Sequence, residues 1–246
     1  MTEERNELLE YINNSLEKSF EKTAVIKETD KSSICIYTHK ESGKKIVKRT
    51  SANRNDEVFR CLKNRNIPNL ANILEVCSAE DYVVTLEEYI DGECLENIIA
   101  DGIIDVKTAC TYAYQLCNAL IELHERKVIH RDIKPSNIII GNDGEACLID
   151  LSIARMQNSE ADSDTESLGT VGYAAPEQFG IVQSNRSTDI YALGIVLNKM
   201  ITGVHPSITI PPGKLGKIIE KTTSIQISKR YSTHINFRRN LNTLYN

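Results

Sequence analysis

The sequence predicts an α+β fold in which a small antiparallel β lobe with one helix precedes a larger, mainly α-helical lobe. Short apolar runs typical of strands recur between residues 22 and 88, whereas two long stretches with helical periodicity, 106–126 and 188–202, lie further along the chain. With 246 residues, the chain can bury a sizeable core and is at the upper end of the size of one domain. We therefore expect one domain with two lobes, and a ligand site where the lobes join.

Changes of period along the chain predict the elements of the first lobe. Apolar residues between 8 and 20 recur at helical spacing with charged residues between them, which predicts an amphipathic helix over residues 3–19. This helix could dock on the domain or bind a partner, including a second copy of the chain. Beyond it we expect strands at 24–26, 34–37, 45–48, 73–76 and 82–86, with a turn at 41–44 and a helix at 56–63.

Composition and charge exclude several classes of protein. Hydrophobic residues make up 41% of the chain and charged residues 26%, which is the balance of a folded protein rather than a disordered one. The formal net charge of -5 gives no basic field, so we expect no nucleic-acid partner. The chain shows no signal peptide and no apolar run long enough to span a bilayer, and its seven cysteines stand singly. These features predict a cytoplasmic protein with reduced thiols.

Four polar residues flank a predicted β-hairpin in the second lobe. Its strands, 138–140 and 146–149, are joined by a turn at 141–144. Asp132, Lys134 and Asn137 precede the first strand and Asp150 follows the second, so the hairpin brings all four to one end. Carboxylate and amide oxygens suit Mg²⁺, and a lysine beside them suits phosphate oxygens. The hairpin therefore predicts a centre for phosphoryl transfer.

The segment His130-Arg131-Asp132-Ile133-Lys134-Pro135-Ser136-Asn137 resembles the catalytic loop of the eukaryotic-type (Hanks-type) serine/threonine protein kinases. The resemblance implies that Asp132 accepts the proton of the substrate hydroxyl and that Lys134 neutralises the γ-phosphate. It implies that Asn137 and Asp150 bind the metal ions. ATP and Mg²⁺, with Mn²⁺ as an alternative, are the implied cofactors. Because the tyrosine-specific form normally lacks the lysine, the implied acceptor is a protein Ser or Thr.

Lys48 marks the expected nucleotide site in the first lobe. It ends the third predicted strand, where the family has the lysine that meets the α- and β-phosphates. The resemblance implies an ion pair between Lys48 and an acid on the helix that follows. Glu57 fits this role best and Asp56 is the competitor.

Residues 86–92 resemble the family's hinge, whose backbone binds the adenine edge. The resemblance implies that the backbone of Glu88 and of Ile90 makes these contacts. Glu87 falls at the gatekeeper position. The alternative for this side chain is an ordinary exposed acid at a strand end.

Residues 169–177 are similar to the end of the family's activation segment, with Ala-Pro-Glu at 175–177. The resemblance implies that Thr170 helps to place the acceptor and that Glu177 pairs with a buried arginine, for which Arg230 is the candidate. It also implies that Asp189 ties down the backbone of the catalytic loop, although a helix N-cap is the alternative. A phosphate on the polar loop, at Ser159, Ser163, Thr165 or Ser167, is a candidate ligand for Arg131.

The sequence departs from the family pattern in three places. Residues 27–33 hold no glycine where the family has its glycine-rich loop, so this backbone approaches phosphates less freely, although Lys31, Ser32 and Ser33 could contact the nucleotide. Asp150-Leu151-Ser152 stands in place of Asp-Phe-Gly. The segment 203–216 is shorter than the helical region that the family usually has at this place.

We read the chain as a helix over 1–21 and a protein kinase domain over 22–246, with lobes at about 22–88 and 92–246. The resemblance implies an ATP-dependent serine/threonine protein kinase, and the segment 172–179 favours a bacterial member. The glycine-free loop keeps a second hypothesis open, a pseudokinase or scaffold. A kinase of a small molecule is disfavoured by Lys134 and by the Ala-Pro-Glu element.

Overall fold

The computed structural model describes residues 3–52, 56–79, 82–157, 169–179 and 184–242. The chain divides into two compact units. The first comprises residues 1–66 and 71–90, and the second comprises residues 67–70 and 91–246.

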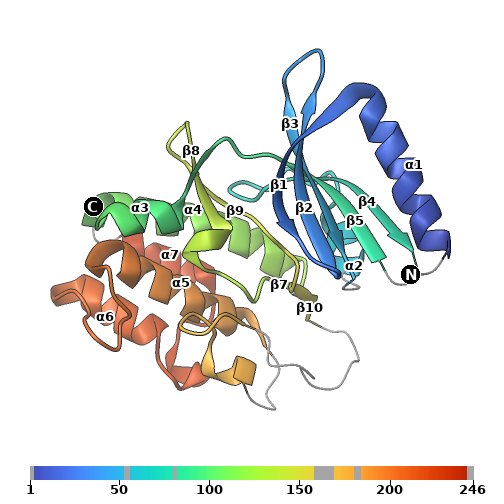
Figure 1. The fold of residues 1–246 in the computed structure, drawn as a ribbon. Coiled ribbons are helices and arrows are strands. Elements are labelled where there is room, and N and C mark those ends of the chain that lie inside the picture. The colour runs from blue at the N-terminus through green and yellow to red at the C-terminus, as the bar shows by residue number, and fades with distance from the viewer. Residues whose placement is uncertain (1–2, 53–55, 80–81, 158–168, 180–183, 243–246) are drawn as a thin grey trace. The chain divides into compact units, whose positions relative to one another are not determined.

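The first unit is built on a five-stranded antiparallel sheet with the order β1-β2-β3-β5-β4 (Figure 1). The predicted strands are confirmed, although the first is longer than its apolar run, because β-pairing with β2 extends it in both directions. The strands are β1 Phe20–Glu28, β2 Ser32–His39, β3 Lys45–Ser51, β4 Ile73–Ala79 and β5 Tyr82–Glu88.

Two helices accompany this sheet, α1 Glu3–Ser19 and α2 Asp56–Leu62. Ile12 and Leu16 of α1 are buried in a cluster with Cys35, Tyr37 and Val84 of the sheet. The bounds predicted for this helix and its docking on the domain are thus confirmed. Burial of these apolar side chains is the main force that can hold α1 on the sheet.

The second unit is mainly helical, and α4 lies at its centre. The inward face of α4 is apolar except for His124 near its C-terminal end, and α5, α7 and β9 pack against this helix. Both long helices begin close to their predicted bounds. The helices of this unit are α3 Leu95–Asp101, α4 Val106–Glu125, α5 Arg186–Thr202, α6 Gly213–Thr222 and α7 His234–Asn242.

Two short strands of the second unit, β8 and β9, form the predicted hairpin. β8 and β9 pair antiparallel, with Ile138 opposite Leu148, and β6 adds a third strand. A two-stranded ladder joins β10 to β7. The strands are β6 Gly92–Cys94, β7 Val128–Ile129, β8 Ile138–Gly141, β9 Ala146–Leu148 and β10 Arg155–Met156, and short 3-10 helices cover Pro135–Asn137, Pro176–Phe179 and Ile227–Lys229.

At the N-terminus of α5, the N-cap is not Asp189, which was one alternative from the sequence. Asn185 is the N-cap, and it forms a capping box with Thr188. Asp189 lies in the first turn of the helix and is fully buried. It is therefore not the N-cap, and its carboxylate is available to other groups.

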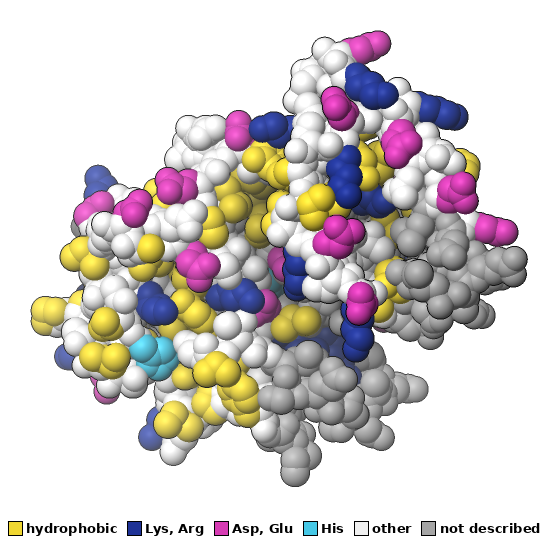
Figure 2. All heavy atoms as spheres, in the orientation of Figure 1, with side chains coloured by type: hydrophobic (Ala, Val, Ile, Leu, Met, Phe, Trp, Pro, Cys, Tyr) yellow, Lys and Arg dark blue, Asp and Glu magenta, His cyan; other side chains and the backbone are white. Residues whose placement is uncertain are grey.

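Charge is dispersed over the described part of the face seen in Figure 2. On the face seen in Figure 2, acidic and basic side chains are intermingled and neither sign forms a continuous field. This pattern agrees with the small net charge of the chain. Among the described residues, no helix has both the length and the apolar character needed to cross a bilayer.

Candidate active site

Asp189 fixes the backbone of the catalytic loop. Its carboxylate accepts hydrogen bonds from the backbone N–H groups of His130 at 3.0 Å and Arg131 at 2.9 Å, and His124 lies 2.8 Å away. Burial by itself raises the pKa of Asp189, but the hydrogen bond with His124, the charges of His124 and His130 and the Arg131 amide together hold this pKa below its usual value. The role that the sequence predicted for Asp189 is confirmed.

Arg131 has a left-handed backbone, with φ of 72°. Such a conformation is costly for a residue with a Cβ and persists only where neighbouring groups enforce it. Here the Arg131 amide donates to Asp189, and the Arg131 carbonyl accepts a 2.9 Å hydrogen bond from the side chain of Gln178. The loop that presents Asp132 is therefore clamped on both sides of residue 131.

Asp132, Lys134 and Thr170 form one hydrogen-bonded group. The Lys134 ammonium lies 2.7 Å from Asp132 Oδ2 and donates to Thr170 Oγ1 at 2.9 Å, while the Thr170 hydroxyl donates to Asp132 Oδ1 at 2.8 Å. All three are half-buried. A carboxylate, an ammonium and a hydroxyl thus converge where the sequence predicted the chemistry, and Thr170 joins them from the activation segment.

Asn137 and Asp150 form the candidate metal site. The β8–β9 hairpin brings them close in the fold, since the Ile149 amide donates to the Asn137 carbonyl at 2.9 Å. The Asn137 amide nitrogen donates to the carbonyl and to Oδ2 of Asp132, both at 2.9 Å. Because both of these partners are acceptors, the remaining atom of the Asn137 amide is its oxygen. An amide oxygen beside a carboxylate suits a divalent cation.

The Ala-Pro-Glu element anchors the activation segment. Glu177 and Arg230 form a buried bidentate pair, with N–O distances of 2.7 and 2.9 Å. The Thr188 hydroxyl donates to the same carboxylate at 3.0 Å. The pairing predicted from the sequence is confirmed. Bidentate geometry and full burial make this contact a strong structural constraint.

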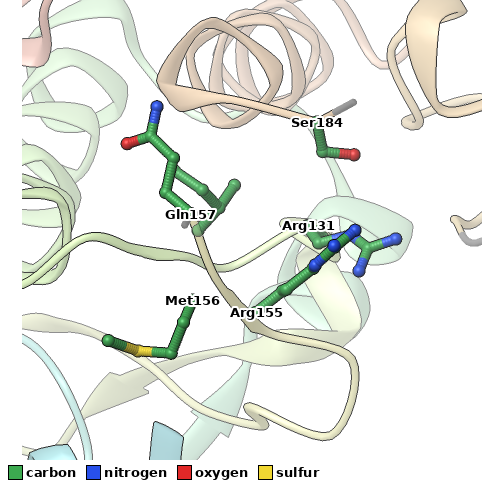
Figure 3. A pocket seen from close by; sticks show the side chains of 6 residues that line it. Arg131, Arg155, Met156, Gln157 and Ser184 are labelled. Atoms are coloured by element: carbon green, nitrogen blue, oxygen red, sulfur yellow. The ribbon is translucent and has the colours of Figure 1, made fainter. Parts of the chain in front are cut away.

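Two arginines lie near the expected phosphate-binding position. Figure 3 shows that the side chains of Arg131 and Arg155 reach the same region, with Ser184 across from them. They line a pocket of about 10 Å³ together with Ile129, Met156 and Gln157, which is room for one water molecule. Ser159, Ser163, Thr165 and Ser167, the predicted modification sites, lie outside the described residues.

In the first unit, the partner of Lys48 is not the acid that the sequence predicted. Lys48 is buried, and its ammonium donates to the side-chain oxygen of Asn13 on α1. Glu57 is exposed, and Asp56 pairs with Arg60 one turn along α2 at 3.6 Å. Among the described contacts, no acid of α2 reaches Lys48. Helix α2 has only seven residues and turns its apolar side chains inward, which leaves its acids at the surface.

One alternative from the sequence was that Glu87 is an ordinary exposed acid at a strand end. This alternative is wrong. Glu87 is buried, and its carboxylate accepts from Arg49 at 3.1 Å and from Thr85 at 2.5 Å. Arg49 and Thr85 stand opposite each other on β3 and β5, so all three groups share one face of the sheet. This contact is internal to the sheet.

Glu88 and Ile90 lie at the end of the first unit, which finishes at Ile90. The amide of Glu88 donates to the Asn72 carbonyl at 2.9 Å, and its carboxylate accepts from the Asn72 side chain at 2.6 Å. The Glu88 amide is thus engaged within the sheet. Contacts of the Glu88 carbonyl and the Ile90 amide with adenine remain a prediction.

The glycine-free loop forms a tight turn that is closed by hydrogen bonds between its own residues. The Thr29 amide donates to the Ser32 carbonyl at 2.8 Å, and the two hydroxyls lie 3.1 Å apart. Beside this turn is a pocket of about 250 Å³. Its walls are mainly polar and include Asn13, Lys22, Glu28, Thr29, Ser32, Ser33 and Lys48.

Lys48 is electrostatically unusual. Burial lowers the pKa of its ammonium, and the Lys22 charge lowers it further, while Cys35 and Glu17 act in the opposite direction. A buried cation beside a second lysine, in a pocket lined by hydroxyls, suits an anionic ligand such as a polyphosphate.

Sequence reasoning missed Asn13, Arg49 and the histidine pair behind Asp189. His234 of α7 lies 3.2 Å from His124, and burial, followed by the His124 charge, holds the pKa of His234 well below 6.5. No local pattern marks these residues. Each acts through a contact that joins distant parts of the chain.

Comparison with known proteins identifies the family to which the chain belongs. The family model described as protein kinase domain matches residues 21–244. The chain belongs to this family.

Curated proteins with similar sequences carry related names. The chain is 34% identical over 171 residues to a probable serine/threonine-protein kinase of Clostridium perfringens, which covers 66% of this chain and 25% of that protein. It is 37% identical over 141 residues to the serine/threonine-protein kinase PrkC of Bacillus subtilis, covering 56% and 22%. It is 31% identical over 189 residues to the serine/threonine-protein kinase cds1 of Schizosaccharomyces pombe, covering 72% and 41%. The chain thus spans less than half the length of each.

Proposed function

We propose that the chain is an ATP-dependent serine/threonine protein kinase, which transfers the γ-phosphoryl group of ATP to protein Ser or Thr hydroxyls. The observation that carries this proposal is the hydrogen-bonded group of Asp132, Lys134 and Thr170. A carboxylate, an ammonium and a hydroxyl meet in this group, and this combination supports a role in transfer to a protein hydroxyl. The names of the similar proteins support the same activity.

Each residue of the site has a distinct task in this reaction. Asp132 orients the acceptor hydroxyl and takes its proton, and Lys134 neutralises charge on the transferred group. Asn137 and Asp150 would hold a divalent cation, Mg²⁺ with Mn²⁺ as the alternative, which would neutralise charge on the phosphate oxygens. Lys48 would bind the α- and β-phosphates, and the backbone at Glu88 and Ile90 would bind adenine.

Protein substrates, regulation and origin belong to the same proposal. The acceptor is a protein, which the anchored Ala-Pro-Glu element supports. A phosphate on Ser159, Ser163, Thr165 or Ser167 would bind Arg131 and Arg155. Seven free cysteines support a reducing, cytoplasmic setting, and the names of bacterial relatives support a bacterial member.

A pseudokinase is the second candidate, and the self-bonded turn at Thr29 favours it, because this turn withholds a backbone amide from phosphates. Incubation with labelled Mg-ATP and a generic protein acceptor separates the two. The kinase predicts transfer that disappears in Asp132→Ala and Asp150→Ala and persists in the exposed control Asp101→Ala. Absence of transfer and of ATP binding in the wild type would establish the scaffold instead.

A further inference from the structure

Helix α1 packs on the face of the sheet that carries Lys48. Lys48 stands directly opposite Cys35 on β2 and Leu86 on β5, and residues opposite each other in a ladder share a face. Cys35 belongs to the cluster that buries Ile12 and Leu16 of α1, and Leu86 packs against that cluster. In Figure 1, α1 runs alongside the five-stranded sheet.

Asn13 follows Ile12 on this docked helix and makes a specific polar contact. It is half-buried, and its side-chain oxygen accepts from the Lys48 ammonium. The Tyr37 ring also lies near this ammonium, with its centroid at 5.9 Å. Because Glu57 is exposed and Asp56 pairs with Arg60, Asn13 fills the place where the family pattern implied an acid.

Asn13 also lines the 250 Å³ pocket together with Lys48. The same pocket is bordered by Lys22, by the acid Glu28 and by the hydroxyl-bearing Thr29, Ser32 and Ser33. A neutral amide holds the lysine without cancelling its charge, so the ammonium keeps its full attraction for an anion.

We propose that Asn13 is a positioning residue, which holds the Lys48 ammonium in place for the phosphates of ATP and makes α1 a part of the nucleotide site. The identity of the ligand rests on the proposed function. The contact between Asn13 and Lys48 does not, so the two can be tested apart. The charged or titratable groups that face Lys48 are Lys22 of β1, Cys35 and Tyr37 of β2, and Glu17 of α1.

The first test needs no activity. The rate at which acetic anhydride acylates Lys48 in the nucleotide-free protein is followed against pH by mass spectrometry. Only the neutral amine reacts, so the midpoint of this curve reports how well the ammonium is stabilised. We expect the midpoint to fall in Asn13→Ala, to rise in Asn13→Asp and to stay unchanged in Asn14→Ala, the exposed neighbour on the same helix. Equal midpoints in all four proteins would overturn the proposal.

The second test measures transfer. Loss of a hydrogen bond to a charged group predicts that Asn13→Ala raises KM for ATP about tenfold, with a smaller change in kcat. Asn13→Asp restores part of the loss, and Asn14→Ala behaves as the wild type. An Asn13→Ala protein with a lower KM would mean that α1 hinders the nucleotide, which also overturns the proposal.

The two tests separate the possible failures. If the wild type shows no Asp132-dependent transfer, the proposed function fails, while the acylation curves still decide the role of Asn13. If transfer is present but the midpoints coincide, only the role of Asn13 fails. Circular dichroism of each variant shows whether α1 is still folded.

Discussion

The carboxylate of Asp189 holds the backbone amide of Arg131 at 2.9 Å, across 58 residues of sequence. The same carboxylate binds the His130 amide and His124, so one fully buried acid sets the conformation of the catalytic loop. The left-handed backbone of Arg131 is the local consequence.

Replacing Asp189 with Ala leaves three buried donors without an acceptor. We expect the free energy of unfolding to fall by about 3–5 kcal/mol, because each unsatisfied buried group costs about 1–3 kcal/mol and some will rehydrate. Urea unfolding followed by circular dichroism measures the loss. The exposed Asp101→Ala protein is the control. A loss below about 1 kcal/mol would show that other groups hold the loop.

Replacing either residue of the Glu177–Arg230 pair leaves the charge of the other buried without its partner. We expect Glu177→Ala and Arg230→Ala each to lower the free energy of unfolding by about 3–5 kcal/mol. The double variant should lose less than the sum, because neither charge then remains alone. Breaking the more exposed Glu122–Arg126 pair should cost about 0.5 kcal/mol. Strict additivity in the double-mutant cycle would contradict the coupling.

His234 makes the fold sensitive to acid. Burial is the main cause that holds its folded-state pKa well below 6.5, and the charges of His124 and Arg186 act with burial against the opposing charge of Asp189. Below about pH 6.5 the unfolded chain therefore binds a proton that the folded chain rejects, so stability falls as the pH falls. The slope from this group approaches about 1.4 kcal/mol per pH unit.

The pH effect is measured by urea unfolding of the wild type and of His234→Asn between pH 8 and pH 5. The difference in free energy between the two proteins should change in favour of the variant as the pH falls. Parallel curves would show that His234 does not titrate on unfolding in this range.

Thr170 tests the organisation of the proposed active site. Its hydroxyl bridges Asp132 and Lys134, so Thr170→Ala should lower kcat/KM by about tenfold or more through misplacement of the acid and the cation. Thr170→Ser keeps the hydroxyl and should restore most of the rate. Steady-state kinetics with a protein acceptor measure the effect. An inactive Ser variant would assign the effect to the lost methyl group.

The sequence by itself determined the strands of the first lobe, the longest helices, the β8–β9 hairpin and the catalytic segment, because all of these are local. Helical periodicity placed α1, α4 and α5, and the turn at 141–144 placed the β8–β9 hairpin. Because that hairpin reverses the chain, the closeness of Asn137 and Asp150 followed from it. Glu177 and Arg230 were paired correctly only through a family resemblance, since nothing local joins them.

Only the tertiary structure decided which groups meet across the fold. The short α2 turns its acids outward, so Lys48 binds Asn13 of a helix that precedes the sheet. The position of Glu87 at a strand end suggested an exposed side chain. It is buried instead, because Arg49 on the neighbouring strand forms an ion pair with it. Spacing along a chain reports which face a residue occupies. Whether a polar residue on that face finds a partner depends on the elements packed against it, and these come from distant sequence.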